Sequence, residues 1–346
     1  MSLEYRVKGE AFGFDTLKCL RTDYYHNDCQ KCLQICPQNA FFFDRSKLTV
    51  DLQQCTNCGV CLGVCPTEAL SLEFFDPNDY IVGLGQEVEL SCKKDLPCLS
   101  VFDVQHFARI LLQSQSAACD FSHCEECSLN PEGKTLASIK ERMREAEEFV
   151  QALGIEKRFE EFSYEPDRRG FFKSIFKATK ELTQDESTSE LHTPLNRIPV
   201  KNTLLKNAIK QHYKELQNTT LPTTFSFLAN KRIEQSCNNC GECVQFCPTD
   251  ALFSAKEGTA IWFMAGKCIA CGICNDVCEP KSIQNEAELD IVEWAFDRGK
   301  ELIEHHIEIC TECKTPFSYK GGELICDRCK SFVEDFGDIF KLASEE

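Results

Sequence analysis

The amino-acid sequence predicts an α+β protein of several domains, in which two related cysteine-rich modules flank a small α/β unit. The 25 cysteines among the 346 residues fall into four groups, at 19–65, 92–127, 237–278 and 310–329. An internal repeat relates the first group to the third, because residues 55–70 and 237–252 are identical at ten of sixteen positions. The chain is therefore expected to contain two copies of one cysteine-rich module.

The charge balance and the hydrophobic pattern exclude several classes of protein. Lys and Arg number 38 against 55 Asp and Glu, which argues against a nucleic-acid-binding surface. No apolar run approaches the 18 residues of a membrane span, and the first residues carry no secretory signal. A cytoplasmic location is expected. In that reducing compartment, closely spaced cysteines indicate metal binding rather than disulfides.

The cysteine spacing within the repeat indicates iron–sulfur chemistry. Cysteines at 55, 58, 61 and 65 follow the pattern C-x2-C-x2-C-x3-C-P, and those at 237–247 repeat it. A third run at 268–278 has the same spacing. Three thiolates two residues apart can bind one iron–sulfur cube, while the displaced fourth cysteine reaches another. Zinc sites, which favour two separated cysteine pairs, fit this spacing poorly.

These motifs resemble those of bacterial dicluster ferredoxins, whose βαββαβ fold binds two 4Fe-4S clusters. The resemblance covers residues 237–285 closely and 19–72 with one departure, and it implies two ferredoxin-like dicluster modules with four 4Fe-4S clusters. In that family each cluster takes ligands from both motifs. Three complete sets follow: Cys237, Cys240, Cys243 and Cys278; Cys247, Cys268, Cys271 and Cys274; and Cys36, Cys55, Cys58 and Cys61.

The departure concerns the fourth set. Cys29, Cys32 and Cys65 are present, but His26 stands where the family has its first cysteine. Three alternatives remain: Cys19 is the fourth ligand, His26 is the ligand, or three cysteines bind a 3Fe-4S cluster. Thiolate is a better ligand than imidazole for the iron of such a cluster, and the nine-residue loop after Cys19 is long enough for this cysteine to reach the cluster. We therefore expect Cys19 to complete the site.

Residues 79–160 are predicted to form a small α/β unit. Strands are expected at 87–91 and 116–121, with a helix at 103–115 between them. Asn130-Pro131 indicates the start of a second helix, and Gly154 indicates its end. Apolar residues spaced three and four apart between these points support that helix.

The second cysteine group lies in this unit. Cys92 and Cys98 follow the first predicted strand, and Cys124 and Cys127 follow the second. Loops at the carboxyl ends of parallel strands meet in one crevice, so these four are expected to share a 2Fe-2S cluster or a zinc ion. The pattern over 79–130 loosely resembles the small iron–sulfur subunits that link hydrogenases to heterodisulfide reductases. Free thiols are the alternative, and Cys119 is expected to be a buried apolar residue.

The last cysteine group predicts a zinc ribbon. Cys310, Cys313, Cys326 and Cys329 form two CxxC pairs separated by twelve residues, a spacing that supplies a tetrahedral site. Iron bound as in rubredoxin is the alternative. A helix is expected before the ribbon, at about 289–306.

Five segments result: a first module (1–78), the α/β unit (79–160), a basic helix and linker (161–200), a second module (201–286), and a helix, ribbon and acidic tail (287–346). Residues 168–180 carry five basic residues and no acid. This segment is expected to pack on the acidic protein itself or to make a peripheral contact with an acidic partner or membrane surface.

No phosphate-binding loop, dinucleotide fingerprint or nucleophile–base pair occurs in the sequence. We therefore expect a polyferredoxin, not an enzyme, that relays single electrons between redox protein partners within an oxidoreductase complex. One alternative is the dedicated electron-transfer subunit of a molybdenum or tungsten enzyme such as a formate dehydrogenase. Another is a redox enzyme that uses the middle cysteines for thiol or disulfide chemistry.

Overall fold

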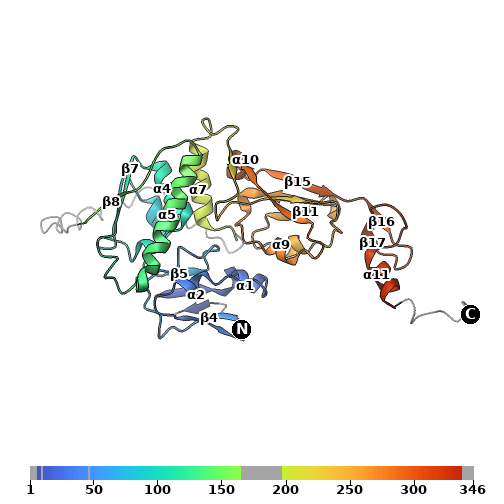
Figure 1. The fold of residues 1–346 in the computed structure, drawn as a ribbon, viewed down its shortest axis with the longest axis horizontal. Helices are drawn as coiled ribbons and strands as arrows, with labels where there is room; N and C mark the ends of the chain where they lie inside the picture. The colour runs from blue at the N-terminus through green and yellow to red at the C-terminus, as the bar shows by residue number, and fades with distance from the viewer. Residues whose placement is uncertain (1–5, 9–10, 46, 165–196, 337–346) are drawn as a thin grey trace, which may run out of the picture.

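The computed structural model describes residues 6–8, 11–45, 47–164 and 197–336. The first module begins with a three-stranded antiparallel sheet in the order β1-β2-β5 (Figure 1). A hairpin of β3 and β4 and two short helices, α1 and α2, lie between β2 and β5 in the sequence. The bounds of these elements are Arg6–Lys8 (β1), Phe12–Asp15 (β2), Leu20–Asp23 (α1), Lys31–Ile35 (α2), Phe41–Asp44 (β3), Lys47–Val50 (β4) and Leu70–Leu72 (β5).

The middle unit is a parallel α/β layer, and its first two strands and two long helices lie close to the predicted ranges. Strands β6, β7 and β8 pair in parallel in that order, and helices α4 and α5 connect them. Asp103 caps the start of α4 through its side chain, and Gly154 follows α5 with a left-handed backbone. The bounds are Pro77–Val82 (α3), Glu87–Leu90 (β6), Val104–Gln113 (α4), Ser116–Asp120 (β7), Lys134–Ala152 (α5) and Glu160–Phe162 (β8).

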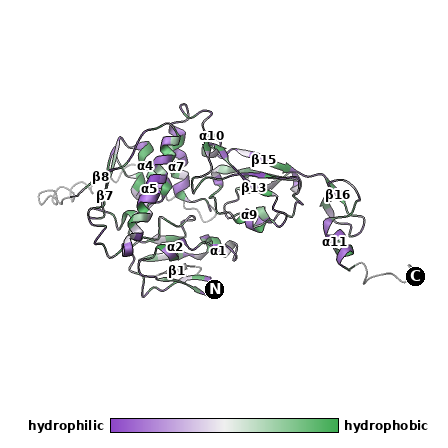
Figure 2. Cartoon of the chain, viewed as in Figure 1, coloured by the Kyte–Doolittle hydropathy of each residue, from purple (hydrophilic) through white to green (hydrophobic). Residues whose placement is uncertain are grey.

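Helix α5 shows how the middle unit buries its apolar residues. Figure 2 shows hydrophilic and hydrophobic residues alternating along this helix. Its buried residues include Ile139, Ala146 and Phe149, which recur at helical spacing and face the core. The expected amphipathic helix after Asn130 is therefore present.

The second module repeats the cysteine-bearing part of the first. Strands β10 and β13 form an antiparallel pair, and β11, β12 and β15 form a three-stranded sheet. A further pair, β9 and β14, lies beside them. The bounds are Thr220–Pro222 (β9), Asn230–Ile233 (β10), Glu242–Gln245 (α8), Leu252–Ala255 (β11), Ala260–Met264 (β12), Ile273–Val277 (α9), Ile283–Glu286 (β13), Glu288–Asp290 (β14), Ile291–Ala295 (α10) and Gly299–Glu304 (β15).

The prediction of a helix at about 289–306 is wrong. Only α10 is helical there, and β15 instead pairs with β12 as the third strand of the sheet. Asp297 has a left-handed backbone, with φ of 53°, which interrupts a helix. Lys256 forms salt bridges with Glu301 and Glu304 of β15. Because an unpaired sheet edge offers backbone hydrogen bonds, tertiary pairing overrides the local helical pattern.

Helix α7 (Val200–Gln211) joins all three units, although the sequence assigned it to the second module. The Glu68 carboxylate of the first module accepts hydrogen bonds from the first backbone N–H groups of α7. The Lys206 ammonium donates to the Gly266 carbonyl and the Asp297 carboxylate of the second module. One continuous hydrophobic core therefore runs from Phe12 through Phe107 to Trp294.

The segment in which a ribbon was predicted, residues 307–336, lies at one end of the molecule in Figure 1, beyond β15. Strands β16 (Ile307–Ile309) and β17 (Pro316–Ser318) pair, and α11 (Asp327–Phe336) follows. The Lys320 ammonium donates to the Ser236 carbonyl of the second module, at 2.8 Å. The predicted basic helix at 168–180 and the end of the acidic tail lie outside the described residues.

Candidate cluster and metal sites

Four cavities in the two modules are each lined by four cysteines, and these are the four sets expected from the sequence. Their empty space, including the part open to solvent, is 310, 360, 340 and 310 Å³. We call them sites I to IV: Cys36, Cys55, Cys58 and Cys61 (I); Cys19, Cys29, Cys32 and Cys65 (II); Cys247, Cys268, Cys271 and Cys274 (III); and Cys237, Cys240, Cys243 and Cys278 (IV).

The local backbone explains why closely spaced cysteines can face one cavity. Gly241 and Gly272, which follow the second cysteines of their motifs, have φ of 77° and 78°. This left-handed conformation, which glycine adopts without steric cost, turns the chain sharply within the ligand loop. Backbone N–H groups also donate to two sulfurs, from Ala40 to Cys36 and from Ala69 to Cys65, each at 3.3 Å. Such N–H···S bonds stabilise a thiolate.

Site II contains Cys19 but not His26. The cavity is lined by Cys19 together with the three cysteines of the regular motif. His26 is exposed, and its ring lies against Tyr24 and Tyr25, with centroids 5.5 and 3.8 Å away. The nine-residue loop after Cys19 therefore allows this cysteine to reach the other three cysteines of site II.

Burial raises the pKa of several thiols in these sites, including Cys19 and Cys268. Burial, with the nearby Cys65 and Cys29 thiols, raises the pKa of Cys19 to about 11. Burial likewise raises the pKa of Cys268 to about 12. Four crowded thiols in an apolar cavity become thiolates together only when metal ions supply positive charge, and metal binding then releases their protons. The donor sets thus fit iron–sulfur clusters, for which thiolate is the usual ligand.

Lys231 provides independent support for a negative group in site III. Its side chain lines the cavity, and the residue is only 2% exposed. The ammonium donates to the amide oxygens of Asn275 and Asn285, and in the described part of the chain it forms no salt bridge. Burial raises the pKa of Cys274, and the Lys231 ammonium opposes that rise. A buried charge needs a counter-charge, and four thiolates around a cluster supply one.

Replacing Lys231 with Gln is expected to lower the reduction potential of the centre in site III. The reduced form carries one more negative charge, so the nearby ammonium stabilises it over the oxidised form. The iron content should not change, because Lys231 is not a proposed ligand. A redox titration followed by electron paramagnetic resonance measures this potential.

The matched control for this prediction is Lys256→Gln. This lysine lies on the same module, but its side chain is largely exposed and pairs with two carboxylates. The control should leave every potential unchanged. An unchanged potential in Lys231→Gln would contradict the role assigned to this side chain.

The middle cysteines lie where the predicted strands place them. Cys92 and Cys98 follow β6, and Cys124 and Cys127 follow β7, at the carboxyl ends of two parallel neighbours. Burial, together with the other three thiols, raises the pKa of Cys98 to about 12. Cys119 is fully buried in β7, as expected. The four cysteines of this middle site therefore lie near one another.

The spacing of the middle site differs from that of the C-terminal site. Among the described residues, one group of three or more Cys, His, Asp or Glu has all its ligand atoms within 4.8 Å of one another, and it is the C-terminal four. The middle thiols are therefore spread more widely than ligands of one tetrahedral ion.

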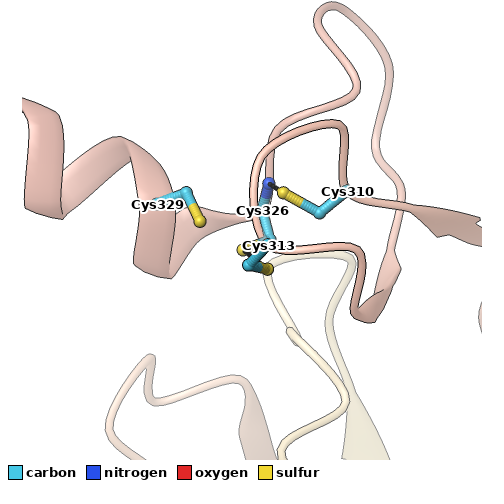
Figure 3. Close-up of side chains that lie close together, drawn as sticks. All are labelled: Cys310, Cys313, Cys326 and Cys329. Atoms are coloured by element: carbon cyan, nitrogen blue, oxygen red, sulfur yellow. Dashed lines mark hydrogen bonds between the residues drawn. The ribbon is translucent and has the colours of Figure 1, made fainter.

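The four C-terminal cysteines converge as ligands of a single metal ion would (Figure 3). The Sγ atoms of Cys313 and Cys326 are 3.7 Å apart, close to the ~3.8 Å expected when two sulfurs bind one tetrahedral metal at about 2.3 Å. Although burial opposes ionisation, backbone N–H groups, the first from Cys326, lower the pKa of Cys310 to about 6. The predicted ribbon cysteines thus form a group suited to metal binding.

Comparison with known families supports the two modules. A family model described as a 4Fe-4S dicluster domain matches residues 27–69, and another with the same description matches 229–279. The first match includes seven cysteines of sites I and II and begins after Cys19. The second includes all eight cysteines of sites III and IV. No curated protein matches the chain. In the described residues, no helix has the length and apolar character needed to cross a membrane.

Proposed function

We propose that this chain, a dicluster ferredoxin-type protein with two modules, relays single electrons between separate redox partners. The observation that carries the proposal is the set of four cavities, each lined by four cysteines, and all of these cysteines except Cys19 lie within the two matched domains. A bound 4Fe-4S cluster accepts and releases one electron at a time. Two modules in one protein favour a fixed path between partners over a diffusing carrier.

The protein's own residues prepare the sites for this role. Most of the sixteen cysteines are buried or half-buried, which keeps water from the bound group. The Ala40 and Ala69 N–H groups and the Lys231 ammonium stabilise negative charge on the ligand sulfurs. Burial, hydrogen bonds and charge are the means by which a protein sets such potentials.

Partners are proposed to approach two exposed cysteines that lie in different units of the protein. Cys240 of site IV and Cys92 of the middle site are both exposed. An oxidoreductase complex is the proposed setting, and a molybdenum or tungsten enzyme such as a formate dehydrogenase is one such partner. The proposed location is the cytoplasm.

The test of this function is an anaerobic reductive titration combined with native mass spectrometry. Sites I to IV should take up about four electrons, one for each cluster. A redox protein that remains bound in the mass spectrum would identify a partner. A protein that takes up no electrons at low potential would contradict the relay.

A second candidate function concerns the middle site, and we propose that its four neighbouring thiols, which follow the carboxyl ends of two parallel strands, hold a 2Fe-2S centre. We propose that this centre extends the relay. The alternative is thiol or disulfide chemistry, which the exposure of Cys92 would permit.

Cys92→Ser and Cys124→Ser are each expected to remove the same 2Fe-2S signal, because both residues would bind one centre. The matched control is Cys119→Ala, a change in the adjacent strand that should affect packing alone. Metal analysis and absorption spectra of anaerobic protein provide the measurement. If the Cys92/Cys98 and Cys124/Cys127 pairs lose metal independently, or bind none, the result would favour thiol or disulfide chemistry at this site.

A further inference from the structure

We infer that electrons cross between the two modules from site II to site III, and that the loop after Cys19 positions this crossing. The inference rests on the proposed relay function and adds the route that electrons take within it. We call residues 20–28 the α1 loop. The regular motif has two residues between its first two cysteines, whereas this loop has nine.

The α1 loop packs directly on the second module. Leu20, Ile269 and Ile273 form a small hydrophobic cluster of their own and are 4%, 6% and 0% exposed. Leu20 belongs to the α1 loop, whereas the two isoleucines lie within the ligand motif of site III. Figure 1 shows α1 beside α9, in agreement with this contact.

Ligands of both sites touch this cluster. Cys29 of site II and Cys271 of site III both pack against this cluster. Two centres held on either side of one side-chain layer are close neighbours. Because electron transfer slows steeply with distance, this layer is a favourable place for the crossing.

A pair of aromatic rings extends the contact. The rings of Tyr24 and Phe246 meet edge to face, with centroids 5.6 Å apart. Tyr24 comes from the α1 loop, and Phe246 directly precedes the ligand Cys247. Such aromatic pairs stabilise an interface beyond the area that they bury.

The α1 loop is held in place by its own hydrogen bonds. The backbone N–H of Cys29 donates to the Asn27 side chain at 3.0 Å, and the Arg21 guanidinium donates to the Asn27 carbonyl. Asn27 is 4% exposed. The irregular spacing that moves one ligand to Cys19 therefore also supplies a fixed surface for the second module.

The remaining contacts arrange the sites in single file. Sites I and II adjoin, because the short helix α2 carries Cys32 of site II and ends at Cys36 of site I. Sites III and IV adjoin in the same way, because α9 carries Cys274 of site III and ends at Cys278 of site IV. At the far end, the Ser100 hydroxyl, two residues after Cys98, donates to the Val60 carbonyl beside site I. The path therefore runs from the middle site through sites I, II, III and IV.

The crossing itself is a simple redox step. One electron leaves the group held in site II, which is oxidised, and enters the group held in site III, which is reduced. No covalent bond forms or breaks, and no proton is transferred.

The test introduces like charges across the junction. Neither Tyr24 nor Phe246 lines a cluster cavity, so both can be changed without removing a ligand. In the Tyr24→Glu/Phe246→Glu variant, two carboxylates repel each other across the contact, whereas Tyr24→Glu/Phe246→Lys restores attraction there. Tyr25→Glu is the matched control, because Tyr25 lies in the same loop and is 67% exposed.

Rapid-freeze electron paramagnetic resonance after mixing with limiting dithionite follows how fast electrons spread between the modules. The Glu–Glu variant is expected to slow this spread about tenfold, since facing like charges are strongly unfavourable at an interface. The Glu–Lys variant should recover most of the rate, and Tyr25→Glu should keep all of it. Every variant should retain the wild-type iron content.

An unchanged rate in the Glu–Glu variant, with all its iron, overturns the junction and leaves the relay itself standing. Failure of the wild-type protein to take up electrons overturns the proposed function instead. If the Glu–Glu variant loses iron, Tyr24→Ala/Phe246→Ala replaces it, and an unchanged rate in that protein overturns the junction.

Discussion

Cys19→Ser is expected to reduce the iron content of sites I to IV from about sixteen to about twelve per chain, or to leave a three-iron centre in site II. The reason is that Cys19 supplies the fourth thiolate of a cavity that already contains Cys29, Cys32 and Cys65. A serine hydroxyl is a harder and weaker ligand for this metal. Iron analysis and electron paramagnetic resonance of anaerobic protein measure the loss.

His26→Ala is the matched control for this prediction. His26 lies in the same loop, and it occupies the position where the resembling family has its cysteine. Because its ring is exposed and lies against Tyr24 and Tyr25, its removal should leave all four clusters intact. The reverse outcome, with iron lost from His26→Ala and kept in Cys19→Ser, would move the ligand to His26. If neither change matters, site II holds a three-cysteine cluster.

Truncation after residue 306 is expected to remove one zinc ion and no iron. The ribbon lies outside the shared hydrophobic core, so the rest of the protein should remain folded without it. Zinc has a filled d shell and does not change oxidation state, so this site would take no part in the relay. Metal analysis and the cluster spectra of the truncated chain provide the measurement.

Cys326→Ala tests the same site within the full chain. Cys326 is 8% exposed, and its sulfur lies 3.7 Å from that of Cys313. Losing it should release the ion and unfold the ribbon, since structural zinc supplies about 10–16 kcal/mol of apparent binding free energy to such segments. The loss of one iron and its absorption from either protein would identify a rubredoxin-like centre instead of zinc.

The cysteine motifs could be read from the sequence because their chemistry is local. Spacing alone predicts which cysteines share a loop, and the crossing of ligands between motifs follows from the resemblance to dicluster ferredoxins. The four cavities contain the expected sets, including Cys19 in site II. The strands and helices of the middle unit were also predictable, since caps such as Asp103 and turns such as Gly154 are local signals.

Features that depend on tertiary contacts could not be predicted. Residues 299–304 have a helical pattern in isolation but become β15, because the edge of β12 is available to pair with them. No sequence pattern distinguishes Lys231 from an exposed lysine, because it is the pairing of β10 with β13 that buries it beside site III. The partners of the α1 loop are more than 200 residues away in the sequence, and no local pattern indicates them.

The most direct test of the relay is the iron and sulfide content of protein purified without oxygen, measured together with its reduced electron paramagnetic resonance spectrum. The account predicts about sixteen irons in sites I to IV, with matching labile sulfide, and interacting paramagnetic centres after reduction. The 2Fe-2S centre proposed for the middle site would add its own two irons. Protein that contains almost no iron, with zinc bound at the cysteines of sites I to IV, would contradict the account.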